Sequence, residues 1–186
     1  MNRILLSLLA FSGLYLASCT SAPPTPVTVQ DIPFPGGEGT SLPSLSSDGT
    51  QLVLSWVATP TDSTAQFHFA RFGEDGTWSS PERIAEGSNW FVNWADYPAL
   101  VQNKGSLLAY HLQKSSPGKF SYDILLHALP KGEQTWRSGL PLHRDSTQTE
   151  HGFVSAAAYT DSTFLVSWLD GRNTGGGGHE GHDGHS

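Results

Sequence analysis

The chain of 186 residues contains a single cysteine, Cys19, so no internal disulfide can hold its fold together. Basic residues are also few: 10 Lys and Arg stand against 17 Asp and Glu, and the basic residues do not cluster. Because proteins that bind nucleic acids depend on clustered Lys and Arg, this balance argues against a nucleic-acid partner. The sequence also lacks a Gly-rich phosphate-binding loop and a nucleophile-elbow serine, and we expect no cofactor.

Long apolar runs are missing as well. The run from Ile4 to Leu16 is too short to span a bilayer as a helix, which takes about 20 residues. It follows a short positively charged segment, Met1-Asn2-Arg3. This order is typical of a secretion signal, and we predict a signal peptide over residues 1–18.

The end of this signal resembles a bacterial lipobox, because Leu16-Ala17-Ser18-Cys19 places small residues directly before the cysteine. The resemblance implies cleavage before Cys19, lipidation of its thiol, and a lipid-anchored protein of the bacterial cell envelope, either periplasmic or at the cell surface. The alternative is a plain signal peptide that contains a cysteine. Residues 19–40 are rich in Pro, Gly, Ser and Thr, which predicts a lipidated cysteine followed by a flexible tether.

A repeat of about 55 residues runs through the rest of the chain. Its first landmark is a short segment that starts at Pro43 and recurs about 55 residues later at Pro98 and again at Ser155. A second landmark lies at a similar distance into the first two units, 35 residues after Pro43 and 38 after Pro98, as Asp75-Gly76-Thr77-Trp78 and as Glu133-Gln134-Thr135-Trp136. Two landmarks in register indicate a repeated structural unit.

Each unit is predicted to consist of short strands. Five segments rich in aromatic and aliphatic residues, most of them alternating with polar residues, are separated by turn-forming residues. No segment after the signal shows a sustained helical pattern of apolar residues. The fold class is therefore all-β, with strands expected at Gln51–Val57, Gln66–Phe72, Ser106–Leu112, Tyr122–Leu129 and Thr163–Leu169.

The Gly-x-Thr-Trp element resembles a degenerate Asp box, and three further motifs accompany it: Asn93–Pro98, Glu150–Phe153 and Trp168–Arg172. Together they resemble the sialidase-superfamily (BNR-repeat) β-propellers, in particular secreted or lipid-anchored bacterial members. The resemblance implies a partial six-bladed β-propeller over residues 41–174, with about two and a half blades, followed by a Gly/His-rich tail at 175–186. A closed ring needs about four to eight blades, so we expect a truncated or interrupted form of a longer protein. A short propeller completed by self-association and a small stand-alone sheet are the alternatives.

The resemblance also places the unusual polar residues in loops that face one pocket, because the innermost strands of a propeller converge on a central channel. Glycoside hydrolysis requires one carboxyl group as a proton donor and a second carboxylate. An arginine guanidinium can hold such a carboxylate in position through two parallel hydrogen bonds. The candidate catalytic residues are Asp96, Glu150 and Asp170. The candidate substrate-binding residues are Trp90, Asn93, Trp94, His151 and Arg172.

Structural interpretations of these residues stay open. Asp170 and Arg172 can close a turn and pair locally, Asp96 can cap its own loop, and the Trp residues can fill a propeller core. Arg144 and Asp145 are interpreted as a surface ion pair. The chain also lacks the Phe/Tyr-Arg-Ile-Pro motif of sialidases proper, which weakens a sialidase assignment.

The sequence thus supports an exported, lipid-anchored sialidase-like propeller fragment that binds a glycan and, if completed, hydrolyses it. Whether it is an enzyme stays open, and the fragment alone is expected to be inactive. The alternative is a non-catalytic propeller lipoprotein that binds a carbohydrate or a protein. A third hypothesis is a metal-binding lipoprotein that uses the tail imidazoles of His179, His182 and His185. A solvated Gly/His loop is the preferred interpretation of the tail, because nothing preorganises these ligands.

Overall fold

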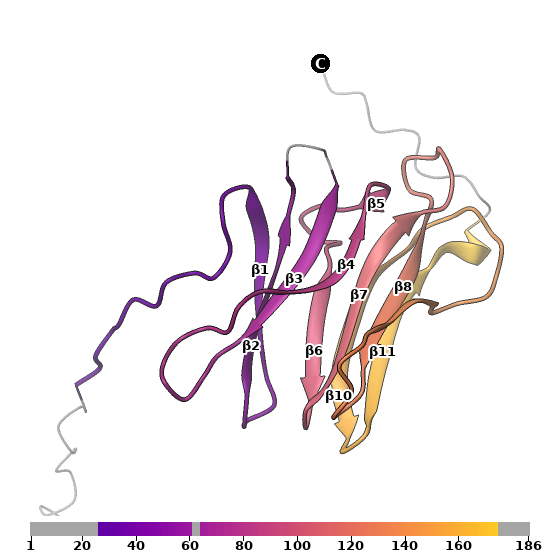
Figure 1. Cartoon of the computed structure of the whole chain (residues 1–186). Helices are drawn as coiled ribbons and strands as arrows, with labels where there is room; N and C mark the ends of the chain where they lie inside the picture. The colour runs from indigo at the N-terminus through magenta and orange to yellow at the C-terminus, as the bar shows by residue number, and fades with distance from the viewer. Residues whose placement is uncertain (1–25, 61–63, 175–186) are drawn as a thin grey trace, which may run out of the picture. The chain divides into compact units, whose positions relative to one another are not determined.

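The computed structural model describes residues 26–60 and 64–174 (Figure 1). The predicted signal peptide, Cys19 and the Gly/His-rich tail lie outside the described residues. By its contacts the chain divides into two units, Met1–Asp31 and Ile32–Ser186, and every strand that the structure describes lies in the second. Within the described part of the chain, no helix has both the length and the apolar character needed to cross a membrane.

The strands form three antiparallel sheets. Sheet 1 is a four-stranded meander of β1 (Thr40–Ser47), β2 (Leu52–Ala58), β3 (Ala65–Arg71) and β4 (Glu82–Gly87). Sheet 2 contains β6 (Ala99–Asn103), β7 (Ser106–Lys114), β8 (Tyr122–Leu129) and β9 (Arg137–Pro141), and the short β5 (Trp90–Phe91) also pairs with β7. Sheet 3 is the hairpin of β10 (His151–Thr160) and β11 (Thr163–Asp170), which leads into a 3₁₀ helix, η2 (Gly171–Asn173).

The predicted all-β class is confirmed, and the five predicted strands correspond to β2, β3, β7, β8 and β11 within one or two residues at each end. The repeat also has a structural counterpart. Its first landmark marks β1, the start of β6, and β10, while its second landmark lies in the turns before β4 and before β9. In the first of these turns the Asp75 carboxylate accepts hydrogen bonds from the backbone N–H and the hydroxyl of Thr77. None of the three sheets closes on itself within the described residues.

Sheet 2 lies between the other two sheets (Figure 1). On one face of β7, Leu107 and Ala109 point into an apolar core that also contains Val57 and Phe67 of sheet 1. Because successive side chains of a strand point to opposite faces, Tyr110 and Leu112 enter a second core, against which sheet 3 packs. The first strands of neighbouring sheets also adjoin, since β6 contacts both β1 and β10.

Two side-chain amides at the end of β6 join the three sheets. The Gln102 amide donates to the backbone carbonyls of Ser46, at 2.6 Å, and Gln51, at 2.8 Å, in the first hairpin. The next residue points the other way, and the Asn103 amide donates to the carbonyls of Thr160, at 2.6 Å, and Thr163, at 3.0 Å, in sheet 3. Both amides are buried. Each therefore satisfies two carbonyls at a junction that water does not easily reach.

A buried histidine pair connects β7 to β8. In the ladder His111 pairs with Leu125 and His127 pairs with Ala109, so the two imidazoles are diagonal neighbours. The distance between His111 Nδ1 and His127 Nε2 is 2.8 Å. Burial lowers the pKa of both imidazoles to about 4, and each imidazole has a further nitrogen without a hydrogen-bond partner in the described structure. Both rings are therefore neutral in the folded protein at neutral pH.

We predict that Gln102→Ala lowers the free energy of unfolding by about 1–3 kcal/mol, because it removes the donor from two part-buried carbonyls. Gln113→Ala is the matched control, since the Gln113 amide donates to the carbonyl of Asn89 at an exposed position where water can replace it. Urea denaturation of both variants measures the difference. Equal losses in the two variants would contradict a special role for the β6 junction.

The histidine pair predicts an acid-sensitive stability. Unfolded imidazoles bind protons below pH about 6.5, while the folded pair resists protonation until about pH 4. The stability that the pair provides is thus complete above pH 6.5 and is lost as the pH falls towards 4. His127→Gln leaves one imidazole of the pair, so we expect it to remove about half of the pair's share of this pH dependence. Urea denaturation across this range tests the prediction, and an unchanged slope would contradict it.

Candidate functional site

The loop between β5 and β6 is a compact turn held by its own side chains. Asn93 Oδ1 accepts hydrogen bonds from the backbone N–H groups of Ala95 and Asp96, each at 2.7 Å. The backbone N–H of Asn93 donates to the carbonyl of Asp96 at 2.8 Å. Trp94 lies at the tip of this turn, where 89% of its surface is exposed.

Asp96 ties this loop to sheet 3. Its side chain is buried, with 3% of the residue exposed. Oδ1 accepts a hydrogen bond of 2.6 Å from the backbone N–H of Phe153, a residue with φ of 51°, and Oδ2 accepts one of 3.4 Å from the hydroxyl of Tyr122. A Cβ at Gly152 would lie 2.8 Å from the Tyr122 ring and 3.0 Å from Asp96 Oδ1, so this close approach requires glycine.

Tyr122, at the start of β8, connects Asp96 to Glu150. Its ring is fully buried and stacks on Phe91 with 4.0 Å between ring centroids. The hydroxyl has one hydrogen, which it donates mainly to Glu150 Oε1 at 2.6 Å and shares with Asp96 Oδ2 at 3.4 Å. Burial, together with the hydrogen bond to Glu150 and the charge of Asp96, raises the pKa of Tyr122 well above its usual value. The phenol therefore stays protonated and serves as a hydrogen-bond donor.

A second polar group surrounds His151, the first residue of β10. We call it the histidine–aspartate cluster; it comprises Asp123, His143, Asp145, His151, Asp170 and Arg172. The fold assembles it because His151 pairs with Asp170 in the β10–β11 ladder and Asp123 follows Tyr122 on β8. His143 and Asp145 come from the loop after β9, and the imidazoles of His143 and His151 stack with centroids 3.8 Å apart.

Arg172 holds the carboxylates of this cluster. Its Nε lies 2.8 and 2.9 Å from the two oxygens of Asp170, a second nitrogen also contacts Asp170, and that nitrogen lies 3.3 Å from Asp145 Oδ2. The Arg172 hydrogen bonds lower the pKa of Asp170 to about 2. Hydrogen bonding by the Thr147 hydroxyl is the main cause that holds the pKa of Asp145 below its usual range, with His151 and Arg172 adding to it. Both carboxylates are ionised at neutral pH.

The structure brings several predicted site residues together. Asp96 and Glu150 share Tyr122, while His151, Asp170 and Arg172 belong to the histidine–aspartate cluster. Asp170 and Arg172 also form the locally paired turn that the sequence left open as an alternative. Asp170 pairs with the Arg172 guanidinium and caps η2 by accepting a hydrogen bond from the Arg172 N–H.

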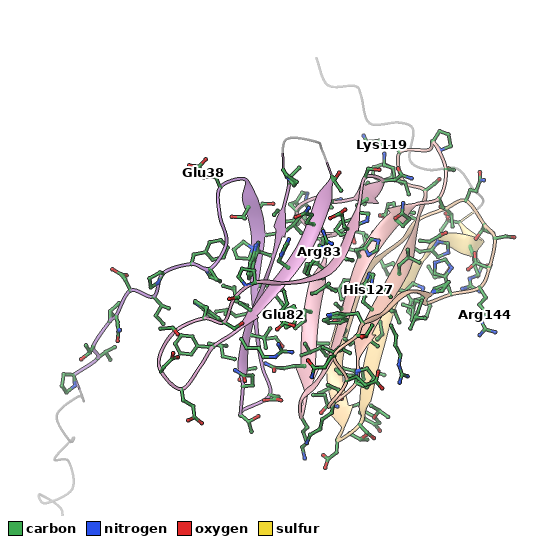
Figure 2. All side chains as sticks on the ribbon, viewed as in Figure 1. Glu38, Glu82, Arg83, Lys119, His127 and Arg144 are labelled. Atoms are coloured by element: carbon green, nitrogen blue, oxygen red, sulfur yellow. The ribbon has the colours of Figure 1, made fainter. Side chains whose placement is uncertain are left out.

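The remaining predicted residues lie apart from these contacts. Trp90 stacks on buried His111 with centroids 4.3 Å apart, so it packs against the sheet. Asn93 shapes the loop, and it takes the capping role that was considered for Asp96, which instead bonds across to β10. The predicted surface ion pair of Arg144 with Asp145 is wrong: Asp145 turns inward to Arg172 and the histidines, and Arg144 is exposed at the edge of the molecule (Figure 2).

Sequence analysis missed four residues of the site: Tyr122, Asp123, His143 and Asp145. The spacing of His143 and Asp145 could have predicted their contact, because residues two apart in an extended segment lie on the same side of the chain. Their hydrogen bond, His143 Nδ1 to Asp145 Oδ2 at 3.0 Å, is consistent with that geometry. Nothing in the local sequence indicates that Tyr122 lies between two carboxylates contributed by other segments.

Comparison of this chain with known protein families, with curated proteins and with solved structures finds no match.

The Asp96 contact predicts a graded pair of variants. Asp96→Ala leaves the Phe153 N–H without an acceptor, and we expect it to lower the free energy of unfolding by about 1–3 kcal/mol. Asp96→Asn retains an oxygen acceptor for this N–H, so its free energy of unfolding should fall clearly less than that of Asp96→Ala. Amide hydrogen exchange at Phe153 should accelerate in the alanine variant. If the two variants were equally stable, the Asp96–Phe153 bond would not be what holds the loop.

Proposed function

We propose that this chain is the glycan-binding part of an exported, lipid-anchored sialidase-like β-propeller, and that it binds without hydrolysis. The observation that carries the proposal is the display of Trp94 on a loop that is held in place from both sides. The lipobox-like segment ending at Cys19 and the apolar run before it support export and anchoring.

The stacking of the sheets supports the propeller part of the proposal. Three antiparallel sheets pack face to face in chain order, and β6 adjoins both β1 and β10, which open the sheets on either side. The two complete meanders carry the same pair of sequence landmarks at the same structural positions. Repeated four-stranded sheets with adjoining first strands are the arrangement of propeller blades.

The loop supports binding because it is organised before a ligand arrives. Asn93 and Asp96 hold the backbone on either side of Trp94, so little conformational entropy is lost when the indole contacts a partner. An indole offers a large flat apolar face together with a polar N–H, which suits the apolar face of a sugar ring. The side chains of Val92 and Tyr97 on the same loop are also exposed and extend this surface.

Binding is favoured over hydrolysis by the state of the three candidate catalytic carboxylates. Asp96 is buried with both oxygens bonded, Glu150 accepts from Tyr122, and Asp170 is paired with Arg172. A glycosidase needs two carboxyl groups that reach the scissile bond. The cavity beside Asp96 has a volume of about 50 Å³, well below the roughly 300–1,000 Å³ of ordinary ligand pockets. A sugar would therefore be bound at the surface loop.

The test is a screen of the full chain against sialylated and non-sialylated oligosaccharides, followed by calorimetric titration of the best binder. Trp94→Ala should weaken binding at least about tenfold, consistent with loss of a stacking contact and its apolar area. Because Trp94 is exposed, the melting temperature of the variant should stay close to that of the parent.

Tyr159→Ala is the matched control. Tyr159 is another exposed aromatic residue, near the opposite end of β10 from the Asp96 contact, so its removal should leave the affinity unchanged. Retained affinity in Trp94→Ala would contradict the binding proposal. Release of product from a sialoside by the parent chain would overturn the claim that it binds without hydrolysis.

A further inference from the structure

The imidazole of His151 has an unused ring nitrogen inside the histidine–aspartate cluster. The residue is fully buried, and Nε2 makes no hydrogen bond to any residue that the structure describes. This atom faces Asp145 Oδ1 at 3.4 Å and Asp170 Oδ1 at 3.6 Å. A buried polar atom without a partner is costly, so its orientation towards two carboxylates calls for an explanation.

The spacing of these three atoms fits ligands around one metal ion. Bonds from a zinc-like ion to histidine nitrogen or carboxylate oxygen are about 2.0–2.2 Å long, which places two tetrahedral ligands about 3.3–3.6 Å apart. The two distances from His151 Nε2 are 3.4 and 3.6 Å, and the three ligand atoms lie within 4.8 Å of one another. The two distances from His151 Nε2 therefore match those between ligands of one ion.

The other nitrogen of His151 sets the tautomer that a metal requires. Nδ1 lies 3.3 Å from the backbone carbonyl of Tyr122, and a carbonyl can only accept a hydrogen bond. The proton of a neutral ring is therefore assigned to Nδ1, and the lone pair of Nε2 points towards Asp145 and Asp170. A backbone carbonyl that orients a metal-binding imidazole in this way is a common feature of protein metal sites.

A second group of atoms, from Asp123, His143 and His151, also lies close enough to hold an ion, but it fits less well. It would use Nδ1 of His151, which lies 3.6 Å from Asp123 Oδ1 and already faces the Tyr122 carbonyl. His143 instead donates from Nδ1 to Asp145 Oδ2, so it orients the carboxylate of Asp145. The first set of atoms is therefore the better site.

The charge of the cluster also matches a divalent ion. The cluster contains three carboxylates, those of Asp123, Asp145 and Asp170. The single guanidinium of Arg172 neutralises only one of these three negative charges. With both imidazoles neutral, two negative charges remain around the buried histidines, in a cluster whose Asp123 and Arg172 side chains reach the surface. Arg172 and His143 contact Oδ2 of Asp145. Oδ1 accepts hydrogen bonds from the N–H and the hydroxyl of Thr147 and is the oxygen turned towards His151.

We propose that His151 Nε2, Asp145 Oδ1 and Asp170 Oδ1 bind one divalent transition-metal ion of the zinc class, with water completing its coordination. This site is separate from the Trp94 surface and does not depend on glycan binding. The ion would fasten the loop after β9 to the β10–β11 hairpin. The competing explanation is a protonated His151 that forms ion pairs with the same two carboxylates and needs no metal.

The test uses the full chain with Cys19→Ser, His179→Ala, His182→Ala and His185→Ala, so that neither the thiol nor the tail can bind the probe. Zn²⁺ is titrated by calorimetry, and Co²⁺ binding is followed by visible absorption as a readout of the ligand set. We expect one equivalent to bind and the melting temperature to rise with Zn²⁺ concentration. Asp145→Asn, Asp170→Asn and His151→Gln should each weaken Zn²⁺ binding at least about tenfold.

Asp123→Asn is the comparison variant, because it removes one charge of the cluster but none of the proposed ligands. It should therefore weaken Zn²⁺ binding clearly less than the three ligand variants do. Circular dichroism without metal checks that each variant folds. If His151→Gln fails to fold, the Zn²⁺ affinities of Asp145→Asn and Asp170→Asn test the proposal. No saturable binding by the parent would overturn the proposal in favour of a protonated His151. Loss of binding in Asp123→Asn with retention in Asp145→Asn and Asp170→Asn would overturn it in favour of the other set of atoms.

Discussion

Tyr122 lies where the core between sheets 2 and 3 meets both polar groups of the site. Its ring packs in that core and against Phe91, and its hydroxyl donates to Glu150 and Asp96. Its backbone carbonyl faces His151 Nδ1. A residue this deeply buried cannot replace lost partners with water, so each contact constrains the others. The positions of the Trp94 loop and of His151 both depend on the start of β8.

The packing of the sheets supplies the rigidity that these contacts need. Sheet 2 shares one core with sheet 1 and another with sheet 3, and the amides of Gln102 and Asn103 satisfy carbonyls on both sides of it. Loops that start and end on such a frame can present side chains in a defined geometry. The exposed Trp94 and the enclosed cluster around His151 are two outcomes of this arrangement. One suits an apolar surface contact, and the other suits a small cation.

Much of the local structure could be predicted from the sequence. Alternating apolar residues between turn formers located β2, β3, β7, β8 and β11, and the repeated landmarks anticipated equivalent positions in successive sheets. The pairing of Asp170 with Arg172 was also foreseeable, because the two residues are two positions apart. The error at Asp145 has the opposite origin: adjacent Arg144 was the obvious partner in sequence, yet the loop turns Asp145 inward to Arg172, which comes from another segment.

The sequence by itself determined that the protein is all-β, because alternation and turn chemistry act over a few residues and need no distant partner. It also determined that the units repeat, and it identified Glu150, His151 and Asp170 as unusual residues. Only the tertiary structure decided that Tyr122 is buried between two carboxylates and that His143 and Asp145 join His151. Such contacts arise when separate sheets pack face to face. Their geometry depends on the burial of side chains from segments far apart in the chain, which no local pattern contains.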